Sequence, residues 1–221
     1  MTPEPELTTT PRTPLSRERV LRTALTLADK SGIESLTMRK LAQQLGVEAM
    51  SLYHYVAKKD DILDGIVDLV IQEIDLPAKD VDWKPATRQI AISAYEALSR
   101  HPWAAGLMFS TGESPARLRY MEALLGTFRE AGFSPELTHH AYHALDSHII
   151  GFTLWVVSFS FEAEDLPELA SSFLAQLPAD EYPYVVEHVR QHLAEPSEDE
   201  GEFEFGLDLI LDGLERLRDT A

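Results

Sequence analysis

The sequence contains no cysteine. A disulfide framework and thiolate chemistry are therefore excluded, and the composition fits a reducing compartment. Long hydrophobic segments are missing as well, because the longest uncharged apolar run, Ile149 to Phe161, is too short for the roughly 20 residues of a membrane-spanning helix. The N-terminal residues show no basic segment followed by an apolar stretch, so we expect no signal peptide and a cytoplasmic protein.

Positive charge is scarce over most of the chain. The sequence has 19 Lys and Arg against 37 Asp and Glu, a net charge of −18. The basic residues are concentrated, because residues 12–59 hold nine of them beside four acidic residues, which gives this segment +5 and leaves −23 for the remainder. Such asymmetry indicates a segment that binds a polyanion, attached to an acidic body.

The hydrophobic pattern predicts an all-α protein. No stretch alternates apolar and polar residues for long enough to form a sheet, whereas helical periodicity recurs along the chain. We predict a disordered tail over residues 1–14, a three-helix unit over 15–58 and a larger helical body over 59–221. The predicted helices run from Ser16 to Gly32, over 38–45 and 49–55, from 59 onward, and over 83–100, 102–109, 115–131, 135–161, 166–176, 182–194 and 203–218.

Two short helices joined by a tight turn stand within the basic segment. Thr37 is placed to cap the first, and Gly46 is placed to end it. The second begins at about Ala49, so that "TMRKLAQQLGVEAMSLYHY" has the spacing of a helix-turn-helix. The N-terminus of such a second helix can enter the major groove of DNA, which makes residues 15–58 a predicted DNA-binding domain.

The chain resembles the TetR/AcrR family of transcriptional repressors. The resemblance rests on residues 32–63, "GIESLTMRKLAQQLGVEAMSLYHYVAKKDDIL", and "GFTLWVV" at residues 151–157 is similar to the tetracycline-repressor branch. The resemblance implies a ligand-responsive repressor without enzymatic activity. It would bind a pseudo-palindromic operator as a homodimer and leave it when a small-molecule effector binds, and residues 59–221 would carry effector binding and dimerisation.

The resemblance also assigns DNA-binding roles. Arg39 matches a base-reading position, where an Arg can donate two hydrogen bonds to guanine. Ala49 and Met50 match base-edge positions, and their apolar side chains suit thymine methyl groups. The remaining matches are phosphate-contacting and positioning residues, namely Ser51, Tyr53, Tyr55 and Lys59.

The central helices carry candidates for an effector site. Aromatic and Met side chains suit an apolar or planar ligand, and polar neighbours can orient it. The candidates are Trp103, Met108, Met121, His143, Asp146, Ser147, Phe152 and Trp155. The acidic body favours an uncharged or cationic compound. We do not expect a magnesium–tetracycline effector, because Gly151, Phe159 and Met108 stand where the tetracycline branch has its chelating and acidic residues.

Histidines raise an alternative. His139 and His143 share a helix face at the spacing of a metal pair, so a helical metalloenzyme, a hydrolase or an oxygenase, is the rival hypothesis. A di-iron bundle needs a second Glu-x-x-His pair, which the sequence lacks. We therefore predict no metal and no cofactor. A third hypothesis, a protein-interaction module that has lost DNA binding, conflicts with the intact DNA-binding set.

Overall fold

The computed structural model describes residues 14–77, 81–108, 114–158, 166–194 and 201–220. Every regular element within these ranges is a helix, so the all-α prediction is confirmed. The predicted tail lies outside the described residues except for Pro14.

Contacts divide the chain into two compact units, Met1–Leu69 and Val70–Ala221. The division falls inside a helix, whereas the sequence suggested a boundary between residues 58 and 59. That boundary stays a prediction.

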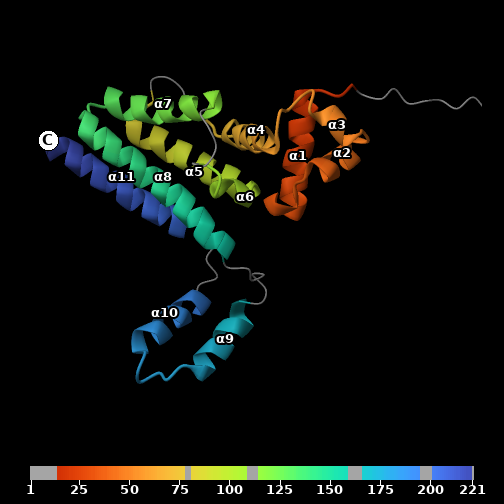
Figure 1. The fold of residues 1–221 in the computed structure, drawn as a ribbon. Coiled ribbons are helices and arrows are strands. Elements are labelled where there is room, and N and C mark those ends of the chain that lie inside the picture. The colour runs from red at the N-terminus through yellow and green to blue at the C-terminus, as the bar shows by residue number, and fades with distance from the viewer. Residues whose placement is uncertain (1–13, 78–80, 109–113, 159–165, 195–200, 221) are drawn as a thin grey trace, which may run out of the picture. The chain divides into compact units, whose positions relative to one another are not determined.

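The first unit is built from short helices with local stop signals. Its elements are α1 (Arg17–Ser31), the 3-10 turn η1 (Ile33–Ser35), α2 (Met38–Leu45), α3 (Ala49–Leu52) and the start of α4 (Lys59–Ile71) (Figure 1). Ser16 and Thr37 cap α1 and α2, since each side-chain oxygen accepts a backbone N–H three residues on, at 3.2 Å. Gly46 ends α2 in the left-handed region at φ 68°, where a residue without Cβ is favoured.

The helices of the first unit approach closely at one glycine. A Cβ added to Gly65 in α4 would lie 2.6 Å from Cδ2 of Leu21 in α1, and Leu21 is buried. The missing side chain therefore lets α1 and α4 pack together. The core of this unit includes Val20, Leu21, Ala24, Leu41, Ala42, Leu45, Leu52, Val56, Ile62 and Ile66.

The third helix is shorter than predicted. The sequence suggested residues 49–55, but α3 ends at Leu52. The N–H groups of Tyr55 and Val56 both bond to the carbonyl of Leu52, at 2.9 and 3.1 Å, and the chain turns there. Val56 is 3% exposed, so the turn continues the buried apolar set that Leu52 begins.

The second unit is a helical body. Its elements are α5 (Trp83–Arg100), α6 (Pro102–Ala105), α7 (Pro115–Glu130), α8 (Pro135–Ser158), α9 (Leu166–Gln176), α10 (Pro183–Ala194) and α11 (Glu202–Thr220). Helix α8 contacts α5, α6, α7 and α11, and α9 contacts α10. Figure 1 shows α5, α8 and α11 side by side, as these contacts require. Phe109 and residues 159–161, which the sequence placed at the ends of predicted helices, lie outside the described residues.

Aromatic packing and ion pairs hold α11 against the body. The ring of Phe203 stacks on that of Tyr95 in α5 at 4.2 Å between centroids. Lys84 in α5 forms ion pairs with Asp212 at 2.7 Å and Glu215 at 2.6 Å in α11. Because these ion pairs are partly exposed, we attribute most of the stabilisation to the buried apolar contacts.

Candidate DNA-binding and effector sites

The turn between α2 and α3 has the geometry of a helix-turn-helix. Leu41, Ala42 and Leu45 are buried on one side of α2, and Leu52 is buried beneath α3. The N–H of Val47 bonds to the carbonyl of Ala42 at 3.0 Å, which closes the turn after Gly46. The short loop and the buried inner faces fix α3 against α2 and leave its other side open.

The seven predicted DNA-binding residues all lie in the first unit and none of them is buried. Arg39 is exposed on the first turn of α2, and Lys59 is exposed as the first residue of α4. On α3, Met50 is 74% exposed, whereas Ala49 and Ser51 are half-buried. The two Tyr residues follow in the turn after α3, Tyr53 exposed and Tyr55 half-buried. Their contacts with DNA stay predictions.

One contact near these residues was missed from the sequence. Oδ2 of Asp61 in the first turn of α4 accepts the backbone N–H of Ala57 at 2.8 Å and that of Lys58 at 3.3 Å. An acidic residue that reaches back over the start of its own helix is the second half of a capping box. Asp61 stands three residues after Lys58, and this spacing is the signal that could have revealed it.

The predicted effector residues differ in burial. Met108 and Asp146 are buried, and Trp103, Met121 and Phe152 are half-buried. The other three, His143, Ser147 and Trp155, are exposed on α8. The structure brings Phe152 and Trp155 together, with 5.5 Å between ring centroids, and assigns no ligand to the set, which stays a prediction.

Asp146 belongs to a buried polar cluster that links α7 to α8. The hydroxyl of Tyr120 donates to Oδ1 of Asp146 at 3.0 Å, and Tyr142 is a second hydrogen-bond partner of this carboxylate. Burial raises the pKa of Asp146, while the bonds from the two phenols and the charge of Arg117 oppose the rise. Burial also raises the pKa of Tyr120 and Tyr142, so both hydroxyls stay protonated as donors.

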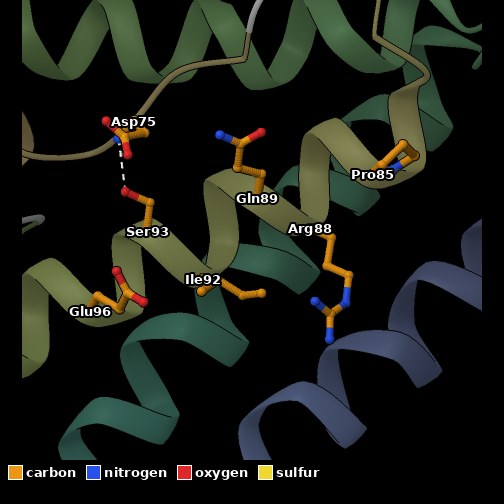
Figure 2. Close-up of a pocket in the computed structure, with 7 residues that line it drawn as sticks. All are labelled: Asp75, Pro85, Arg88, Gln89, Ile92, Ser93 and Glu96. Carbon is orange, nitrogen blue, oxygen red and sulfur yellow. Dashed lines mark hydrogen bonds between the residues drawn. The ribbon is translucent and has the colours of Figure 1, made fainter.

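Two surface hollows of the second unit are lined by other residues. One of about 450 Å³ lies along α5 and the segment before it, where the N–H of Asp75 donates to Oγ of Ser93 at 2.8 Å (Figure 2). Figure 2 shows Arg88 directed from this hollow toward α11, where it pairs with Asp208 at 3.0 Å. The other, of about 770 Å³, includes Trp83 and Arg218, whose guanidinium lies 5.4 Å from the indole centroid. Neither hollow is lined by any of the predicted effector residues.

Exposed apolar side chains occur on both α8 and α11, which contact each other. Leu154, Trp155 and Val157 on α8 are 44–47% exposed, and on α11 Phe205 and Leu209 are 68% and 57% exposed. A monomeric protein rarely exposes so many large apolar side chains on two neighbouring helices. The arrangement suits an interface with a second copy of the chain.

The histidine pair lies on the surface of α8. The rings of His139 and His143 are 4.5 Å apart between centroids, and both residues are exposed. Over the described ranges, the structure shows no group of three or more His, Cys, Asp or Glu side chains that could hold a metal ion. The arrangement therefore gives the metalloenzyme hypothesis no further ligands in that part of the chain.

The fold and the open face of α3 define a regulator of the helix-turn-helix class. Residues 20–66 match the family model of bacterial regulatory proteins of the tetR family, and residues 76–218 match that of the tetracyclin repressor-like C-terminal domain. The chain belongs to the tetR family. It is a ligand-responsive transcriptional repressor.

Relatives support this assignment over nearly the whole chain. The HTH-type transcriptional repressor DrrR1 of Streptomyces coeruleorubidus is 34% identical over 94% of this chain and 80% of DrrR1. The tetracycline repressor protein class C of Escherichia coli is 30% identical over 94% of each chain. Apo ActR from Streptomyces coelicolor is structurally similar, with a TM-score of 0.77 and 26% identity over 94% of this chain and 98% of ActR. ActR has also been solved in complex with actinorhodin.

Proposed function

We propose that the chain represses transcription by placing α3 in the major groove of an operator. The observation that carries this proposal is Met50, which is 74% exposed on α3 while Leu52, two residues on, is fully buried. An exposed apolar side chain on a short helix suits a thymine methyl group. Arg39 would read a guanine, and Ala49 would lie against a second base edge.

We assign the phosphate contacts to residues that follow the start of α3. Ser51, Tyr53 and Tyr55 would donate hydroxyl hydrogen bonds to the DNA backbone, and Lys59 would add a positive charge at the start of α4. These contacts set the register of α3 on the duplex and carry no sequence information by themselves.

The repressor acts as a homodimer in this proposal. One small helix-turn-helix makes few contacts, and two copies related by a two-fold axis read a pseudo-palindrome. The exposed apolar side chains of α8 and α11 supply the surface on which the copies meet.

The helical body binds an effector that releases the operator. We favour an uncharged or cationic planar compound, because the buried carboxylate of Asp146 and the acidic body disfavour anions. A magnesium chelate is not favoured, since Gly151 and Met108 supply no metal ligand. Release requires that the effector bind better to a conformation in which α3 no longer matches the groove.

Two further features belong to the proposal. The chain has no enzymatic activity and acts in the cytoplasm. No helix in the part of the chain that the structure describes is long and apolar enough to cross a membrane.

Metal analysis of protein purified without an affinity tag tests the rival metalloenzyme hypothesis, because a stoichiometric metal bound by His139 and His143 would support it.

Selection of DNA from a random library tests the main proposal. The full-length protein should enrich one pseudo-palindromic sequence, and sedimentation should give a complex of two protein chains per duplex. A wild-type monomer at micromolar concentration that binds one half-site specifically would contradict the dimer. Failure to enrich any sequence would contradict the proposal that the chain is a sequence-specific repressor.

A further inference from the structure

The turn that leads into α4 is held by one carboxylate oxygen. Oδ2 of Asp61 accepts two consecutive backbone N–H groups, from Ala57 at 2.8 Å and from Lys58 at 3.3 Å. Asp61 is half-buried, and its carboxylate makes these bonds charge-assisted. The two bonds fix the backbone of residues 57–58 relative to the first turn of α4, on which Lys59 stands.

The neighbouring carboxylate acts on the same lysine in another way. Oδ2 of Asp60 lies 3.1 Å from Nζ of Lys58, and both side chains are about two-thirds exposed, at 65% and 66%. The hydrogen bond to Asp60, followed by its charge, raises the pKa of Lys58. Asp61 therefore holds the backbone of Lys58, whereas Asp60 holds its ammonium group.

Two acidic residues are unfavourable beside a phosphate, because like charges repel at short range. Removal of either negative charge should, by that effect alone, strengthen binding to DNA. The contacts of Asp61 and Asp60 differ, however, so their substitutions should have opposite consequences.

We propose that Asp61 is a positioning residue for the contact of Lys59 with the DNA backbone, whereas Asp60 weakens binding to the DNA backbone by pairing with the ammonium group of Lys58. This inference rests on the proposed function, since it needs the first unit to bind DNA. Asp61 acts through the turn and touches no phosphate itself. A phosphate that recruits Lys58 has to compete with Asp60 for its ammonium group.

Three full-length variants separate these roles. Asp61→Ala removes the acceptor, Asp60→Ala removes an equal charge one residue away, and Asp61→Asn removes the charge of Asp61 while keeping a side-chain oxygen that can accept. The probe is a short, fluorescently labelled duplex of random sequence, titrated over a series of salt concentrations. Far-UV circular dichroism and thermal unfolding identify a temperature at which all variants are folded.

The expected changes have opposite signs. Asp61→Ala should lower affinity by about fivefold per half-site, because the turn that places Lys59 is no longer held, and make the salt slope shallower by about one unit for each lost phosphate contact. Asp60→Ala should raise affinity and steepen the slope by up to about one unit per half-site as Lys58 becomes available. Asp61→Asn should bind with at least the wild-type affinity, because the acceptor is kept and one negative charge near the DNA is removed.

A role in charge alone or in stability alone gives different results. If Asp61→Ala and Asp60→Ala both strengthen binding, net charge explains the pair and the inference is overturned. If Asp61→Ala lowers thermal stability but keeps the wild-type salt slope, Asp61 only stabilises α4 and the inference is again overturned. Wild-type protein that binds no duplex at any salt concentration overturns the proposed function itself, and this inference with it.

Discussion

The hydroxyl of Tyr120 lies 3.0 Å from Oδ1 of Asp146, so a phenol on α7 holds a buried carboxylate on α8. Burial raises the pKa of this carboxyl above its usual value. A group whose pKa is raised in the folded state binds a proton more readily there than in the unfolded chain. Its contribution to stability is therefore complete below the unfolded pKa of about 3.9 and is lost as pH rises through the folded pKa.

This linkage predicts how wild type and Asp146→Asn diverge with pH. The free energy of unfolding of wild type, relative to that of the variant, should fall as pH rises from about 3.9 through the raised pKa. Tyr120→Phe should cost about 1.5–3 kcal/mol where the carboxylate is ionised, because it removes a donor to a buried charge. Urea denaturation across this pH range checks both. A wild-type advantage that grows with pH would contradict the assignment.

The contact between Tyr120 and Asp146 also shows what the sequence could not reveal. The two residues are 26 positions apart on different helices, and neither segment carries a sequence signal that identifies the other as its hydrogen-bond partner. Asp146 was predicted as an effector residue from its place beside aromatic residues, whereas its phenolic partners were missed. Similarly, Glu73 binds both Arg100 at 2.9 Å and His101 at 3.2 Å, across more than 25 residues.

Local features were predictable because their causes lie within a few residues. Thr37 and Gly46 bound α2 as predicted, since a cap and a left-handed glycine act on the adjacent turn. The end of α3 was not predictable in this way, because the burial of Val56 in the unit's core decides where the chain turns. The DNA-binding residues could be proposed from the sequence because the family motif lies in contiguous residues, and their contacts stay predictions.

Gly65 provides a test of packing in the first unit. Gly65→Ala should destabilise the protein by about 1–3 kcal/mol, because the new Cβ meets the buried side chain of Leu21 at 2.6 Å. Gly126 in α7 is the matched control, since a Cβ added there would have no atom within 4 Å beyond its chain neighbours and the adjacent backbone of its own helix, and Gly126→Ala should stabilise by about 0.5–1 kcal/mol. Thermal unfolding measures both. Equal effects at the two positions would show that helix propensity, not the approach of Leu21, dominates.

Arg39 and Lys59 should contribute to DNA binding in different ways. Arg39→Ala should cost about 1–3 kcal/mol on the operator and relax the preference at one base pair per half-site. Lys59→Ala should weaken binding to all sequences alike and make the salt slope shallower by about one unit per half-site. Titration of operator and single-base variants at several salt concentrations distinguishes the two. An equal loss of discrimination in both variants would contradict this division.

The dimer surface can be tested at two leucines of α11. Leu209 is 57% exposed and Leu214 is 6% exposed, so only the first is free to face a second copy. Leu209→Asp should abolish dimerisation and operator binding while the helical content is retained. Leu214→Asp should instead unfold the protomer, because it buries an unpaired charge in the core. Sedimentation and circular dichroism check this, and a dimeric Leu209→Asp variant would move the interface elsewhere.

The close approach of α8 and α11 constrains the same surface. The ring of His148 occupies the space that a side chain at Gly206 would need, because an added Cβ would lie 2.6 Å from Cε1 of His148. Nε2 of the same ring lies 2.8 Å from the carbonyl oxygen of Phe203. Gly206 thus allows a close contact between α8 and α11 within one protomer. Leu209, one turn further on, remains available for the partner copy.

The effector prediction follows from charge and burial in the body. Cationic or neutral planar compounds should release operator DNA, and anionic analogues should release it poorly, because the chain outside residues 12–59 carries −23. A hundredfold loss of DNA affinity corresponds to about 2.7 kcal/mol of coupling, within the usual allosteric range.

Trp103 is half-buried and can stack on a planar cation, which contributes about 0.5–2 kcal/mol when water is excluded. Trp103→Ala should therefore raise the concentration of a cationic compound needed for release, and Asp146→Asn should reduce the preference for cations. His143 is exposed, so His143→Ala serves as the comparison and should change release less. The measurement is displacement of labelled operator by a matched panel of cationic, neutral and anionic aromatics. Release by anionic compounds alone, unchanged by Trp103→Ala and Asp146→Asn, would show that both the charge preference and the residues assigned to the effector site are wrong.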